Sequence, residues 1–169
     1  MEKVDIYNRF RELTGITKGR KEVEKGEYRI STHIWVMDSM GRILVLKRSE
    51  MEDKFPGMWA QVGGGVVAGD TSKETVIKEC MEELGLTVVE DNMYYVASYT
   101  RTKDIVDVWL VLQDVNVNEL VLQDEEVADA KLVSIEEFDS MIDSGIVVPS
   151  INPSYDLMRN YVKQYMDKE

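Results

Sequence analysis

The stretch from Gly64 to Leu86 constrains this chain more than any other part of its sequence. It begins with a glycine-rich segment, residues 64 to 70, and continues into an acidic segment, Lys78-Glu-Cys-Met-Glu-Glu-Leu-Gly-Leu86. At about 100° per residue, the periodicity of the second segment predicts a helix with one apolar arc toward the core. The residues on that arc are Val76, Ile77, Cys80, Met81 and Leu84.

Three glutamates share a separate arc of the same predicted helix. Glu79, Glu82 and Glu83 are spaced so that their carboxylates lie side by side. Like charges this close repel by a few tenths of a kcal/mol per pair, so the cluster is costly without a cation. A hard dication such as Mg²⁺ prefers carboxylates together with substrate phosphates. The pattern predicts a metal site for phosphate chemistry, and the alternative is a solvated acidic face on an acidic protein.

The spacing of this stretch resembles the Nudix box. The box reads Gly, five residues, Glu, seven residues, Arg-Glu, an aliphatic residue, any residue, Glu-Glu, any residue, Gly and an aliphatic residue. Cys80 stands at an aliphatic position, Asp70 replaces the first Glu, and Lys78 replaces the Arg. The positions that match by identity are Gly64, Glu79, Glu82, Glu83, Gly85 and Leu86. The chain is therefore identified as a member of the Nudix hydrolase superfamily.

The resemblance implies an α/β fold, the Nudix-type alpha/beta/alpha sandwich with a mixed beta-sheet. It also implies a site in which Mg²⁺, or Mn²⁺ in its place, is held by carboxylates and a glycine carbonyl. The implied ligands are Gly64, Glu79, Glu82 and Glu83. Lys78 stands where the family uses an arginine to hold the catalytic Glu79, and a lysine offers a point charge in place of a planar fork.

A water that attacks phosphorus also needs a base. The resemblance offers Glu79 or an acid of the loop at Glu125 and Glu126, of which Glu126 is the first choice, and a solvated acidic turn is the alternative. Arg48 ends a predicted strand, where relatives place a substrate-binding arginine, and the alternative is an exposed strand-end residue. Lys54 and Arg101 are weaker candidates of the same kind.

The function implied by these residues is Mg²⁺-dependent cleavage of a diphosphate bond that joins a nucleoside diphosphate to another moiety. The first alternative is isopentenyl diphosphate isomerase, because Asp5-Ile-Tyr and the segments after it resemble that bacterial branch. Such isomerases carry a cysteine after the Trp-containing loop and several metal-binding histidines, whereas residues 60 to 65 here lack a thiol and His33 is the only histidine. The second alternative is a catalytically silent Nudix domain that only binds its ligand.

Charge and composition limit the kinds of partner that the protein is expected to bind. The net charge of −12 without a long basic run argues against nucleic acid and anionic membranes, and leaves a small-molecule diphosphate as the expected partner. No apolar run approaches the roughly 20 residues of a membrane helix, and the first residues lack the pattern of a signal peptide. The single cysteine, Cys80, fits a reducing compartment and a small buried hydrophobe. We expect a cytoplasmic protein.

The 169 residues suit one domain, residues 1–169, with an N-terminal hairpin extension at 1–27, a Nudix core at 28–148 and a C-terminal helix at 149–169. The hairpin pairs 4–7 with a strand after Gly15 and is our candidate for a homodimer contact. A capping box of Ser134 and Glu137 begins a helix over 135–144, and another helix is expected at about 154–168. Aromatic residues in strands are expected in the core: Trp59, Tyr94, Tyr95 and Trp109. The further strands expected are 28–38, 42–47, 94–100, 105–115 (alternating through Val106, Val108 and Leu110) and 131–134.

Overall fold

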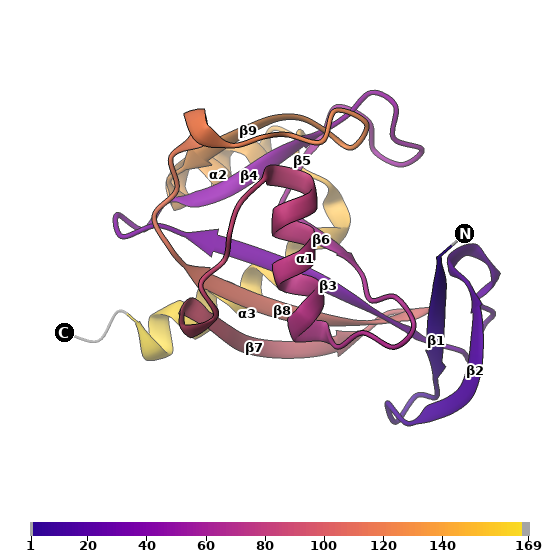
Figure 1. The fold of residues 1–169 in the computed structure, drawn as a ribbon. Helices are drawn as coiled ribbons and strands as arrows, with labels where there is room; N and C mark the ends of the chain where they lie inside the picture. The colour runs from indigo at the N-terminus through magenta and orange to yellow at the C-terminus, as the bar shows by residue number, and fades with distance from the viewer. Residues whose placement is uncertain (1, 167–169) are drawn as a thin grey trace.

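A seven-stranded mixed sheet forms the centre of the protein, and the computed structural model describes residues 2–166 (Figure 1). Its strands run in the order β5-β4-β3-β8-β7, while β6 pairs with β3 and β9 pairs with β4. β3 and β8 are parallel, and the other pairs are antiparallel. The strands of the described residues are β1 Lys3–Tyr7, β2 Leu13–Gly19, β3 Arg29–Met37, β4 Ile43–Arg48, β5 Trp59–Ala60, β6 Val62–Gly65, β7 Met93–Thr100, β8 Asp104–Leu112 and β9 Val127–Val133.

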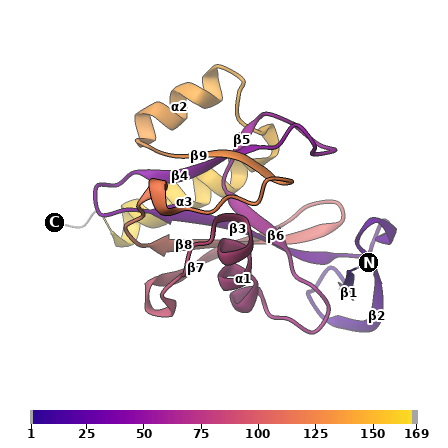
Figure 2. The same cartoon turned by 45° about the horizontal axis from the view of Figure 1, so that its top comes forward.

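Helices cover both faces of this sheet. α1 (Ser72–Leu84) packs on one face, and α2 (Ile135–Asp143) and α3 (Asn152–Tyr165) pack on the other (Figure 2). Short 3₁₀ turns lie between the elements: η1 Arg20–Glu22, η2 Glu90–Asn92, η3 Val117–Glu119 and η4 Pro149–Ile151. The predicted alpha/beta/alpha sandwich is confirmed.

Each face of the sheet has its own hydrophobic cluster. On the α2–α3 face, the Trp35 ring lies 5.8 Å from Phe138 and 5.5 Å from Tyr155, and its Nε1 donates to Ser154 Oγ at 2.8 Å. On the α1 face, Val76, Cys80 and Leu84 pack against the opposite side chains of the sheet. Because both faces are covered, the central strands are buried at nearly every position instead of alternating.

The predicted alternation of β8 is therefore wrong. Val106, Val108 and Leu110 are buried as expected, and so are the residues between them. The alternation signal is lost because a central strand between two helical layers has no solvent-facing side. β8 also ends at Leu112 and not at residue 115.

The apolar arc predicted for α1 is only partly correct. Val76, Cys80 and Leu84 are fully buried, but Ile77 and Met81 are 36% and 47% exposed. Thr75 and Glu83 are buried in their place. The helix contacts mainly β6 and β3, so only a narrow stripe of its surface meets protein.

Cys80 and His33 behave as packed residues. Burial raises the pKa of the Cys80 thiol to about 12, which suits an inert side chain. His33 lies buried on β3, and burial, with a further contribution from the Arg101 charge, lowers its pKa to about 4. The imidazole is therefore neutral at physiological pH.

Aromatic residues divide between the core and the surface. Trp59 and Trp109 are buried as predicted, whereas Tyr94 and Tyr95 are 36% and 50% exposed. The prediction failed for the two tyrosines because they lie on β7, which is an edge strand of the sheet.

Capping explains where the helices begin. α1 carries a complete capping box between Thr71 and Glu74, with both hydrogen bonds at 3.1 Å, which the sequence reasoning missed. At α2, the Ser134 hydroxyl accepts from the Glu137 backbone N–H at 3.0 Å as predicted, but the Glu137 carboxylate turns to Lys131 at 3.6 Å. β9 is longer than the predicted strand at 131–134, and α3 begins two residues early. The predicted helix positions 167 and 168 lie outside the described residues.

The expected N-terminal hairpin is present as the two-stranded sheet β1–β2. Its first strand holds the loop before α1, since the Lys3 carbonyl accepts from Ala68 N–H at 2.8 Å and Asp5 Oδ2 accepts from Gly69 N–H at 3.0 Å. Its turn is tied to β8, because the Arg11 guanidinium donates to both oxygens of Asp107 at 2.6 and 2.8 Å. Within the described residues, no helix is long and apolar enough to cross a membrane.

Candidate metal and catalytic site

Glu79 lies directly against the backbone of the glycine strand β6. A Cβ atom on Gly64 would stand 2.5 Å from the Glu79 carboxyl carbon, so only glycine leaves room for this approach. Gly64 itself is held by β3, because the Thr32 hydroxyl donates to the Gly64 carbonyl at 2.8 Å. Gly64 therefore belongs to a strand and not to the glycine-rich loop that the sequence suggested.

Glu83 brings the loop before β9 to the same place. The Glu126 carboxyl and the Gly63 backbone both act on the Glu83 carboxyl group: the Glu126 charge raises the pKa of Glu83, and the Gly63 backbone lowers it. The Gln123 N–H donates to the Glu83 carbonyl at 3.0 Å, and Ser49 N–H donates to the Glu126 carbonyl at 2.9 Å. The loop before β9 is thus hydrogen-bonded to the last turn of α1, although the two are far apart in the sequence.

The acidic side chains of this site act on one another electrostatically. Burial, followed by the charges of Glu82 and Glu126, raises the pKa of Glu79 to about 7. Burial, followed by the charges of Glu79 and Glu126, raises the pKa of Glu83 well above its usual value. Burial also raises the pKa of Glu126. The structure therefore brings Glu79, Glu82, Glu83 and Glu126 close enough together for their charges to act on one another, with Lys78 and Arg20 opposing part of the effect.

The residues present fit a hard divalent cation. All donors are oxygens, and their mutual repulsion is what a dication would relieve. Within residues 2–166, no three acidic, imidazole or thiol groups stand close enough together to enclose an ion by themselves. Mg²⁺ does not need such a cage, since it usually keeps several waters. Glu79, Glu82, Glu83 and the Gly64 carbonyl are the groups that would hold it.

Substitution of Gly64 tests this close approach. In Gly64→Ala, the added methyl group meets the far end of a flexible side chain, so we expect the Glu79 carboxylate to be displaced while the fold survives. A displacement of about 1 Å costs up to about a hundredfold in rate. Stability should change by less than about 1 kcal/mol, because alanine is no worse than glycine in a strand. Turnover and thermal unfolding measured together check this, and an active Gly64→Ala enzyme would contradict it.

The two residues that depart from the Nudix pattern contact each other. Lys78 Nζ lies 3.8 Å from Asp70 Oδ2. The Lys78 charge also lowers the pKa of Glu79, opposing the larger effect of burial. Lys78 thus interacts with Asp70 in the loop before α1 and also with Glu79, the carboxylate that the sequence predicts it to position.

We expect Lys78→Ala to lower the turnover rate by about ten- to a hundredfold, the usual effect of losing an orienting neighbour of a metal ligand. Lys78→Arg should keep the activity. Stability should barely move, because a half-exposed ion pair contributes about 0 to 1 kcal/mol. Lys73→Ala is the matched control. Lys73 lies at the start of the same helix, and its ion-pair partner, Glu90, lies outside that helix. Equal rates in Lys78→Ala and Lys73→Ala would assign Lys78 to the surface.

Arg48 lies at the end of β4, next to the acidic cluster. Its Nε donates to the Lys54 carbonyl at 2.9 Å, and its Nη2 donates to Glu52 at 3.2 Å. The Glu52 charge in turn raises the pKa of Glu126. The structure thus places Arg48 against the loop that borders the site. In the neighbouring loop, Glu125 and Glu126 are both exposed.

Two contributors to the site were missed from the sequence. The Thr32 hydroxyl donates to the Gly64 carbonyl, and the Gly63 backbone lowers the pKa of Glu83. Both act through the pairing of β3 with β6, and a sequence carries no local signal for such a partner.

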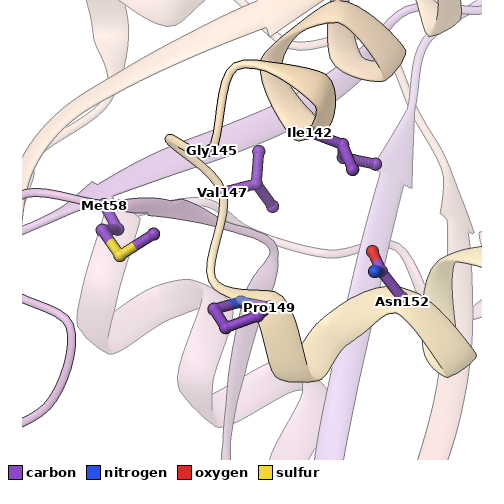
Figure 3. Close-up of a pocket in the computed structure, with 6 residues that line it drawn as sticks. All are labelled: Met58, Ile142, Gly145, Val147, Pro149 and Asn152. Atoms are coloured by element: carbon purple, nitrogen blue, oxygen red, sulfur yellow. The ribbon is translucent and has the colours of Figure 1, made fainter.

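A separate pocket lies around the segment that joins α2 to α3 (Figure 3). Its walls are mostly apolar and carry no acidic or basic side chain. The lining residues are Met58, Ile142, Gly145, Val147, Pro149 and Asn152.

Most of the chain is similar in sequence to known proteins. Residues 27–149 match the sequence profile of the NUDIX domain. An uncharacterised Nudix hydrolase of Listeria monocytogenes is 34% identical over 151 residues, which cover 88% of this chain and 89% of that protein.

Solved structures share the fold at low sequence identity. A Deinococcus radiodurans protein superimposes with a TM-score of 0.76 at 19% identity, covering 94% of this chain and 98% of the other. A bifunctional NMN adenylyltransferase/ADP ribose pyrophosphatase of Francisella tularensis, complexed with AMP and a manganese ion, gives a TM-score of 0.62 at 17% identity, with 85% of this chain and 43% of the other covered.

Proposed function

Because the chain belongs to the Nudix family and is a hydrolase of pyrophosphate bonds, we propose that it is a Mg²⁺-dependent enzyme acting on a nucleoside diphosphate linked to another moiety. Mn²⁺ is the alternative cation. The observation that carries the proposal is the approach of the Glu79 carboxylate to Gly64 of β6, with Glu83 and Glu126 close enough to act on it electrostatically. The structural neighbour described as an ADP ribose pyrophosphatase with AMP and manganese supports both the ligand class and the kind of cation.

The chain's own residues have distinct parts in this reaction. Glu79, Glu82, Glu83 and the Gly64 carbonyl would hold the cation, which when bound neutralises phosphoryl oxygens and makes a water more acidic. Gly64 admits the Glu79 carboxylate, and Lys78 and Asp70 brace the start of the helix. Arg48, at the border of the site, would bind a substrate phosphate.

We assign the proton acceptor to Glu126, with Glu79 as the second choice. Glu126 comes from a different element than the other acids and reaches Glu83 from outside α1. Because Glu126 is not one of the proposed metal ligands, it is free to accept a proton from the attacking water.

A substrate panel tests the proposed function. The protein is incubated with ADP-ribose, nucleotide sugars, dinucleoside polyphosphates and nucleoside triphosphates, each with Mg²⁺, with Mn²⁺ or with EDTA, and nucleotide products are separated by chromatography. We expect a nucleoside monophosphate product in the presence of metal and none with EDTA. Absence of turnover of every compound would refute the hydrolase proposal and favour a domain that only binds its ligand.

A further inference from the structure

Arg11 lies at the tip of the N-terminal hairpin, in a backbone conformation that arginine rarely adopts. Its φ of 62° is in the left-handed region, which favours glycine and asparagine. Asn8 holds the tip in this shape, because its side-chain oxygen accepts from the backbone N–H groups of Phe10 and Glu12 at 2.9 and 3.1 Å. Since an arginine occupies this strained position, its side chain is expected to have a role that glycine could not fill.

The Arg11 side chain connects the hairpin to the beginning of α1. Its guanidinium donates to both oxygens of Asp107, a residue of β8 whose side chain is 1% exposed. Burial opposes the ionisation of this carboxyl group, but Arg11, Ser98 and Ser72 outweigh burial and lower its pKa. Ser72 is the first residue of α1, and its hydroxyl accepts from Trp109 Nε1 at 2.8 Å. The tip of the hairpin, β8 and the first turn of α1 therefore meet at one carboxylate.

A second part of the hairpin is attached to the loop that joins β6 to α1. The Lys3 carbonyl accepts from Ala68 N–H at 2.8 Å. The Asp5 carboxylate accepts from Gly69 N–H at 3.0 Å. Gly69 has a φ of 89°, so the loop turns sharply at the residue that Asp5 holds. The hairpin thus contacts this loop through β1 and the beginning of α1 through its tip.

The loop between these two attachments sets the distance between proposed metal ligands. Residues 66–71 connect β6, which carries Gly64, to α1, which carries Glu79. The Glu79 carboxylate already lies so close to Gly64 that a side chain there would collide with it. A small shift of α1 along β6 would therefore change the oxygens offered to a cation. The hairpin also acts on the site directly, because burial and, to a smaller extent, the Glu2 charge raise the pKa of Glu79.

We propose that the N-terminal hairpin positions α1 for metal binding, with Arg11 and Asp5 as its positioning residues. The proposal rests on the proposed function, since it concerns the same carboxylates. Residues 1–26 lie outside the part of the chain that matches the NUDIX domain, so this role belongs to an addition to that domain. Arg11 acts through Asp107, and Asp5 acts through the loop before α1. Loss of either contact is expected to loosen the geometry of the metal ligands.

Amide hydrogen exchange followed by NMR in EDTA tests the attachment without metal or turnover. Arg11→Met should speed the exchange of the Ala68 and Gly69 amides at least about tenfold, and Arg9→Gln, at the same exposed tip, should change it less than about twofold. Kinetics test the consequence for the site. Arg11→Met and Asp5→Ala should raise the Mg²⁺ concentration for half-maximal rate at least about fivefold and leave the substrate KM within about twofold, and Arg11→Lys should recover part of the loss.

Ser154→Ala is the stability control, because it removes the acceptor of the Trp35 hydrogen bond on the other face of the sheet. It should lower the Tm and leave the Mg²⁺ requirement unchanged. If Arg11→Met fails to fold because the Asp107 charge is left buried and unpaired, the double variant with Asp107→Asn and the single variant Asp5→Ala decide. Wild-type exchange and Mg²⁺ requirement in these variants, or equal changes in Ser154→Ala, would overturn the proposal. Failure of the hydrolase proposal would look different, since wild type would then cleave no compound of the substrate panel while Arg11→Met still loosened the loop.

Discussion

Glu83→Gln is expected to abolish the rise in Tm that Mg²⁺ or Mn²⁺ produces and to lower turnover by at least about a hundredfold. Glu83 is buried at the end of α1, its carbonyl accepts from Gln123 N–H of the loop before β9, and the Gly63 backbone and the Glu126 charge both act on its carboxyl group. An amide keeps the shape of this side chain but cannot supply an anionic oxygen. Thermal unfolding with and without metal, together with turnover of the best substrate, measures both effects.

The same variant carries its own control for folding. Since a carboxylate in this position is destabilised by burial and by Glu79, Glu83→Gln in EDTA should be at least as stable as wild type. A loss of the metal-induced shift in a protein of normal stability can then be attributed to the site. Wild-type activity in Glu83→Gln would refute the assignment of the metal ligands.

Glu126→Gln is expected to lower the maximal rate by about 10² to 10⁴ and to leave the KM nearly unchanged, the signature of a lost proton acceptor. The reason is geometric: Glu126 reaches the Glu83 carboxyl group from a loop, while the acids of α1 are the ones placed to hold a cation. Steady-state kinetics over a range of substrate concentrations separates the two parameters.

Glu125→Gln is the matched control, because it makes the same change one residue earlier in the same exposed turn. We expect it to retain the wild-type rate. If both variants keep more than about half of that rate, the loop is a solvated turn and Glu79 becomes the favoured base. If Glu125→Gln alone is impaired, the role of the loop stands and the residue assigned to it changes.

The sequence by itself determined the helix, its carboxylates and the fold class. The spacing of Glu79, Glu82 and Glu83 is a property of one helix, and a helix has the same period wherever it packs. The same locality explains why the N-terminal hairpin and the cap at Ser134 were found. Family membership followed from these local patterns, because the glycines and glutamates of the box lie within one continuous stretch of chain.

Only the tertiary structure decided which residues from other parts of the chain contact the residues of the box. Ile77 and Met81 had the period of core residues but lie exposed, because the width of the buried stripe depends on what the helix packs against. Thr32 gave no signal in the sequence, and its hydrogen bond to Gly64 depends on the register of β3 with β6. Register joins residues more than thirty positions apart, and its free energy comes from long-range pairing and burial, which no local pattern of residues encodes.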